Sequence, residues 1–201
     1  MLDAKVIFNH HIDKMTNNAR RTLAFIKRRS KEFKDPYVTK TLFCSLVRSK
    51  LEYASVVWNS NCVSSVSKIE SVQKQFLLFA LRNLGWRRDT FSLPSYTARL
   101  KLLNMETLEK RRSDFDTMFA FDLIRKNIKC AELCDKIVFN IPAPQNVRRR
   151  RLLVISSHTR NYSYNEPFSR VARALNNVAV HYDGSIGRFP FRNKLRAAVS
   201  N

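Results

Sequence analysis

The chain has 201 residues, and its 37 Lys and Arg against 16 Asp and Glu give a formal net charge of +21. Hydrophobic residues make up 44% of the chain, which is enough to bury a core at this length and argues against general disorder. Three glycines are too few for a Gly-rich phosphate loop or a turn-rich β-sandwich, and four cysteines make no disulfide framework. No apolar run is long enough to cross a membrane. The composition therefore predicts a basic, mainly α-helical, intracellular protein.

The first predicted element is an amphipathic helix over residues 10–33. Its apolar residues recur at three- and four-residue steps and form one stripe, made of Ile12, Met15, Ala19, Leu23 and Ile26. Most of the Lys and Arg of this segment fall outside the stripe. Burial of the stripe is therefore expected to turn a basic face outward.

A second helix is predicted to begin after Asp35, because Asp followed by Pro36 is typical of an N-cap and the first helical position. Its expected buried side consists of Val38, Leu42, Leu46 and Val47. The segment Leu51–Trp58 either continues this helix or follows it after a bend. Its valines and aromatic residues fit a strand equally well.

A third helix is predicted to open at a capping box, Ser67 to Glu70, and to end near Gly85 as the C-cap. Its expected inward residues are Ile69, Val72, Phe76 and Ala80.

The second half of the chain is predicted to hold further helices. They cover Pro94 to Leu102, Asn104 to Asn127 with Leu108, Phe115, Phe119 and Leu123, a short piece over Cys130 to Lys136, and Glu166 to Val180. Prolines and four consecutive arginines after Pro142 indicate an exposed connector, and Tyr182 to Phe191 is expected to be irregular.

No group of residues predicts independent catalysis or a metal site. Cys130 and Cys134 have an acceptable spacing for zinc, but a second ligand pair is missing, and two buried thiols are the simpler interpretation. The aspartates of the long helix are expected to pair with arginines at helical spacing. Trp86 is a candidate for stacking on a base, although a core position is favoured.

The surplus of positive charge instead predicts an anionic partner. Arginine outnumbers lysine in the basic clusters, which suits phosphate because the guanidinium group grips it with two hydrogen bonds. A solvated charged surface is the alternative. The predicted nucleic-acid-binding residues are Lys14, Arg20, Arg21, Lys27, Arg28, Arg29, Lys31, Lys34, Arg87, Arg88, Arg148, Arg149, Arg150 and Arg151.

Several segments occur in an order that is known from one family. They are Phe8–Ile12, Phe25–Arg29, Leu46–Trp58, Ile69–Phe76, and Arg99–Leu103 followed by Arg111 and Arg112. This order resembles the C-terminal part of reverse transcriptases from non-LTR retrotransposons of the jockey-like kind. The resemblance covers nearly the whole chain, and its most specific part is Leu-Glu-Tyr with the later Trp, followed by Ile-Glu-x-Val-Gln.

The resemblance implies a division of the chain by role. Residues 1–9 would be the end of the palm, 10–90 a thumb-like helical bundle, 91–141 post-thumb helices, and 142–201 a basic connector with a less regular C-terminal segment. In the family, the palm carries a Tyr-x-Asp-Asp turn that holds the catalytic magnesium, and no Asp-Asp pair occurs here. This chain alone is therefore expected to hold no cofactor and to be non-catalytic.

The resulting hypothesis is a fragment of an RNA-directed DNA polymerase that binds the RNA–DNA template–primer duplex through a basic helical surface. Its expected partners are RNA, the RNA–DNA duplex and the palm and fingers, with no membrane, in cytoplasm and nucleus. The alternative is a stand-alone protein-interaction module derived from a mobile element, whose apolar groove would include Leu42, Leu46 and Phe76. A third possibility is an element remnant without present function.

Overall fold

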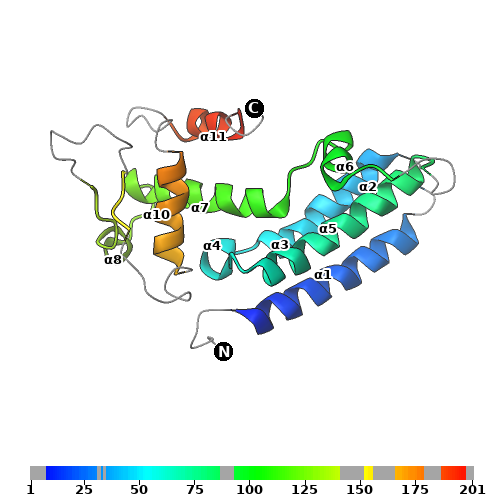
Figure 1. The fold of residues 1–201 in the computed structure, drawn as a ribbon, viewed down its shortest axis with the longest axis horizontal. Helices are drawn as coiled ribbons and strands as arrows, with labels where there is room; N and C mark the ends of the chain where they lie inside the picture. The colour runs from blue at the N-terminus through cyan, green and yellow to red at the C-terminus, as the bar shows by residue number, and fades with distance from the viewer. Residues whose placement is uncertain are drawn as a thin grey trace. The chain divides into compact units, whose positions relative to one another are not determined.

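The structure is a computed structural model, and it describes residues 8–30, 33, 35–86, 93–140, 152–155, 166–178 and 187–197. The chain is mainly helical, as predicted, and within these ranges the only β-type pairing is an isolated antiparallel bridge between Phe139 and Leu153. The described residues fall into two compact units (Figure 1). The first unit lies within 7–55 and 60–111, and the second within 56–59 and 112–201. The predicted division by role stays a prediction, because it depends on the resemblance.

The helices of the first unit surround one apolar core. They are α1 (Asn9–Arg29), α2 (Pro36–Leu42), the π-helix η1 (Phe43–Arg48), α3 (Ser49–Glu52), α5 (Val63–Asn83) and α6 (Tyr96–Leu102). Helix α1 packs along α5 and also contacts η1 and α3 (Figure 1). Helix α4 (Ser55–Trp58) and helix α7 (Leu108–Ile124) each have residues in both units.

The stripe predicted for the first helix is confirmed. All five of its apolar residues are buried in α1, together with Thr16. The helix ends at Arg29, earlier than predicted, and its last turn consists of Lys27, Arg28 and Arg29. Cations at this end interact favourably with the negative end of the helix dipole.

The start of the second helix is confirmed, but of the four residues of its predicted buried face only Val47 is buried. The Asp35 carboxylate accepts a hydrogen bond of 2.8 Å from the backbone N–H of Tyr37. Val38 and Leu46, however, are 41% and 43% exposed, and Leu42 is only half-buried. The buried residues are Thr39, Phe43, Val47 and Leu51, at steps of four.

The π-helix η1 explains this shift. A regular α-helix has 3.6 residues per turn, so residues at successive steps of four drift around its axis. The wider turn of a π-helix takes up the extra residue and keeps the four side chains on one side. Phe43 then stacks on Phe76 of α5, with the ring centroids 4.1 Å apart.

The segment after Leu51 bends and stays helical. Helix α3 ends at Glu52, Ala54 has a positive φ of 52°, and α4 begins at Ser55. Of the interpretations left open for this segment, the bend is confirmed and the strand is wrong.

The predicted capping box is wrong, because α5 begins at Val63 and already includes Ser67. The buried Glu70 carboxylate accepts hydrogen bonds from the Tyr96 hydroxyl, at 2.5 Å, and from the backbone N–H of Glu109, at 2.9 Å. Glu70 therefore caps the first turn of α7 instead of its own helix. The predicted inward residues of this helix are all buried.

The end of α5 near Gly85 is confirmed. Gly85 has a φ of 87°, a conformation that favours glycine. Its N–H donates to the carbonyl of Arg82, and the N–H of Trp86 donates to the carbonyl of Leu81. These two bonds form a Schellman motif, which satisfies carbonyls at the end of the helix.

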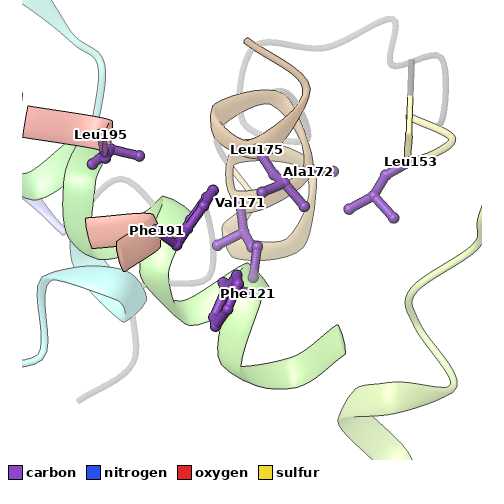
Figure 2. Close-up of a cluster of buried hydrophobic side chains, with 8 residues drawn as sticks. Phe121, Leu153, Val171, Ala172, Leu175, Phe191 and Leu195 are labelled. Carbon is purple, nitrogen blue, oxygen red and sulfur yellow. The ribbon is translucent and has the colours of Figure 1, made fainter. Parts of the chain in front are cut away.

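The second unit is built from α7, α8 (Ala131–Cys134), α10 (Pro167–Asn177) and α11 (Arg188–Ala197). Figure 2 shows its core, in which the rings of Phe121 and Phe191 come together with a centroid distance of 4.6 Å. Side chains from α10, namely Val171, Ala172 and Leu175, complete the cluster with Leu153 and Leu195.

Predictions for the second half of the chain had mixed outcomes. Helix α10 is confirmed, but α11 begins at Arg188, so the irregular segment predicted up to Phe191 is wrong for its last residues. On α7, Leu108 and Leu123 are buried as predicted, whereas Phe115 and Phe119 are only half-buried. The connector predicted after Pro142, up to Arg151, lies outside the described residues.

Candidate nucleic-acid interface

Helix α1 carries all the predicted binding residues that the structure describes. They are Lys14, Arg20, Arg21, Lys27, Arg28 and Arg29, against a single acidic residue, Asp13. The other predicted residues, Lys31, Lys34, Arg87, Arg88, Arg148, Arg149, Arg150 and Arg151, lie outside the described residues.

Three of these cations form a row along the outer side of α1. Lys14, Arg21 and Arg28 are exposed and follow one another at intervals of seven residues. Seven residues are close to two helical turns, so the three side chains leave the helix on nearly the same side, about 10.5 Å apart along its axis. None of them forms an ion pair or hydrogen bond with another side chain in the described ranges. We call these three residues the outer row.

On the side of α1 that faces α5, the basic side chains interact with that helix, unlike those of the outer row. Arg20 donates a hydrogen bond of 2.9 Å to the hydroxyl of Ser71. Lys27 is half-buried, and burial together with the nearby charge of Arg82 lowers the pKa of its ammonium group. Both predicted residues therefore also take part in the contact between the two helices.

The one acid of α1 does not neutralise the outer row. Asp13 forms an ion pair of 2.7 Å with Lys68 of α5. Because its charge is matched by that lysine, the outer side of α1 keeps its positive potential.

The opposite flank of α1 contains residues that sequence reasoning missed. Phe25 is 52% exposed, and the Cζ atom of Arg29 lies 6.0 Å from the centroid of its ring. Lys50 of α3 donates a hydrogen bond of 2.8 Å to the hydroxyl of Thr22, which adds another cation beside α1. The position of Phe25 outside the apolar stripe was a signal in the sequence, whereas the approach of Lys50 depends on the packing of α3.

The sequence also raised a possible metal site at two cysteines and a possible stacking role for a tryptophan. No group of three or more His, Cys, Asp or Glu side chains among the described residues could hold a metal ion. Cys130 and Cys134 are half-buried free thiols, and Trp86 is half-buried at the end of α5.

The described helices include none that is long and apolar enough to cross a membrane. Comparison with known proteins gives no match, whether with family models, with curated sequences or with solved structures.

Proposed function

We propose that this chain binds the phosphate backbone of a nucleic-acid duplex through the outer row of α1. The observation that carries the proposal is the alignment of Lys14, Arg21 and Arg28 on the side of α1 opposite its buried stripe. A straight helix holds these cations at fixed intervals, so they can follow a line of phosphates. Such contacts position a duplex without reading its sequence.

The resemblance extends this proposal to a biological role. The chain would be the thumb and post-thumb region of a non-LTR retrotransposon reverse transcriptase, and its ligand would be the RNA–DNA template–primer duplex. The palm and fingers would be its protein partners and would supply the magnesium ions and the catalytic groups. An RNA–DNA duplex is recognised mainly by its shape and its backbone, which agrees with a row of cations on one helix.

The burial pattern of α1 favours nucleic acid over an anionic membrane. A helix that lies on a membrane inserts its apolar face into the lipid. The apolar face of α1 is buried within its own unit, where Leu23 and Ile26 are almost fully covered. The exposed face of α1 therefore offers positive charge to a polyanion, and it lacks an apolar surface large enough for insertion into lipid.

The alternative of a protein-interaction module has less support. Phe76, one of the residues expected to line its apolar groove, is fully buried and stacked on Phe43. Leu46 is exposed, but it no longer faces a groove that includes Phe76.

The proposal is tested by reversing two charges of the outer row. Fluorescence anisotropy measures the affinity of the R21E/R28E variant for a labelled RNA–DNA duplex between 50 and 200 mM salt, settings typical of such titrations. We expect the affinity to fall about 10- to 100-fold. The slope of log affinity against log salt should also become shallower, by the amount that about two phosphate contacts contribute.

The matched control is the K101E/K129E variant, which reverses two exposed lysines outside α1 and changes the net charge equally. It should retain most of the affinity. An R21E/R28E variant that binds like the wild type, or a control that loses as much affinity, would show that α1 is not the binding surface.

A further inference from the structure

Phe25 lies among three arginines on the exposed surface of α1. Arg21 precedes it by four residues, and Arg28 and Arg29 follow it by three and four, so all three are its neighbours on the helix surface. The Phe25 ring is 52% exposed, and the Arg29 guanidinium lies 6.0 Å from its centroid, at the outer limit of a cation–π contact. About half of the Phe25 side chain therefore stays exposed, next to three positive charges.

This combination decides what kind of partner fits. An apolar protein surface that covered Phe25 would also remove water from neighbouring guanidinium groups, which is costly without anionic partners. A nucleotide satisfies both parts, since its base offers a π-face and its phosphate a negative charge. We propose that Phe25, with Arg21, Arg28 and Arg29, is a stacking site for an unpaired nucleotide. This inference rests on the proposed function of α1 and names the part of the ligand that its C-terminal half recognises.

The position of Phe25 along α1 gives the site a direction. Lys14 and Arg21 lie toward the N-terminus of the helix, whereas Phe25 lies about 6 Å beyond Arg21 along the axis, toward Arg28. Lys50, bonded to Thr22, adds a further cation one turn before the ring. In this proposal the duplex backbone follows the outer row from its Lys14 end, and the first unpaired nucleotide of a single-stranded extension reaches Phe25 near the Arg28 end.

The experiment compares two RNA–DNA duplexes that differ only in a short single-stranded RNA extension on one of them. The wild-type chain should bind the extended duplex about 5- to 100-fold more tightly than the blunt one, since stacking on an aromatic side chain has an effect of this size for each base. The F25L variant keeps an apolar side chain without the π-face and should lose this preference. The F25W variant should keep it.

The matched control is F189A, because Phe189 of α11 is also exposed, at 77%, but lies in the second unit. F189A should leave the preference unchanged, and its affinity for the blunt duplex and its salt dependence should stay within about twofold of the wild type.

Two failures can be told apart. If the wild type binds the blunt duplex in a manner that depends on Arg21 and Arg28, but shows no preference for the extension or keeps it in F25L, the stacking site is wrong and the proposed function stands. If the wild type binds neither duplex, the proposed function is wrong and the stacking site with it.

Discussion

Glu70 of the first unit and Asp116 of the second are both buried carboxylates, and they have different kinds of partner. In the first unit, Glu70 accepts hydrogen bonds from two uncharged donors, the Tyr96 hydroxyl and a backbone N–H. In the second unit, Asp116 accepts a hydrogen bond of 2.8 Å from the Arg170 guanidinium and one of 3.2 Å from the Asn59 side-chain amide.

The charged network of the second unit joins segments that are far apart in the sequence. Arg170 of α10 also donates to the backbone carbonyls of Val56 and Asn59, and the Nε of Arg112 donates to the Asn59 side chain. Arg112 and Arg170 are both buried. Burial raises the pKa of Asp116 above its ordinary value, and the charge of Arg170 opposes this shift.

The difference shows how a very basic chain uses its few acids. The first unit closes mainly through long apolar helix faces, and Glu70 joins α5 to the start of α7 with neutral bonds. In the second unit, Asp116 forms an ion pair with the buried Arg170, and the buried Arg112 joins the same network through Asn59. A buried ion pair is sensitive to the loss of one partner, whereas a neutral hydrogen bond costs less to remove. The second unit should therefore be the more vulnerable to a single polar substitution.

The largest expected effect follows from Asp116→Ala. The substitution leaves Arg170 buried without its carboxylate partner and should destabilise the second unit by about 3–5 kcal/mol. Trp58 is buried in this unit, so its fluorescence in a W86F background reports urea unfolding of the second unit. Ser113→Ala, an exposed position on the same helix, is the control and should change stability little. A loss below about 1 kcal/mol for Asp116→Ala would show that the network does not hold the unit together.

A smaller loss is expected for Glu70→Ala in the first unit. The Tyr96 hydroxyl and the Glu109 N–H would lose their acceptor, which should cost about 1–3 kcal/mol. Glu70→Gln keeps one acceptor oxygen and should cost less. Hydrogen exchange of the backbone amides in α5 and α7 measures both losses. Equal losses for the two variants would contradict the role given to the acceptor oxygens.

The smallest effect concerns the thiols of the two units. Cys62 is exposed at the start of α5, and hydrogen bonds from Ser64 and Ser65 lower the pKa of its thiol. Cys130 and Cys134 of the second unit are half-buried. Because the thiolate is the reactive form, iodoacetamide should modify Cys62 first, with a midpoint pH below the usual value of about 8.5.

Peptide mapping by mass spectrometry measures the order of modification. Ser64→Ala should move the midpoint upward, since the thiolate loses a donor. Faster modification of Cys130 or Cys134 would reverse the expected contrast between the units.

Local sequence patterns predicted those parts of the fold that local interactions determine. The stripe of α1 follows from residue spacing alone, and the Asp35 cap needs only the N–H of Tyr37 two residues later. The hydrogen-bond donors to Glu70 lie 26 and 39 residues further along the chain. The capping box was therefore the wrong interpretation, because this carboxylate makes tertiary contacts and not a local cap.

The candidate site shows the same limit. The cations of α1 could be found from composition and spacing. Their separation into an outer row and a flank held by α5 could not, because it depends on Ser71 and Arg82, which lie more than 50 residues away. The exposure of Phe25 could have been predicted, because its spacing already places it away from the apolar stripe.

The wide turn of η1 has a consequence for how its segment can pack. Helices that repeat their contacts with a period other than 3.6 residues usually keep them aligned by winding around each other. From Thr39 to Leu51 a buried residue occurs every four residues, which differs from the 3.6 residues per turn of an α-helix. The π-helix compensates for this difference within one short segment. The segment can therefore keep these four side chains on one side without a supercoil, and Phe43 of η1 reaches Phe76 of α5.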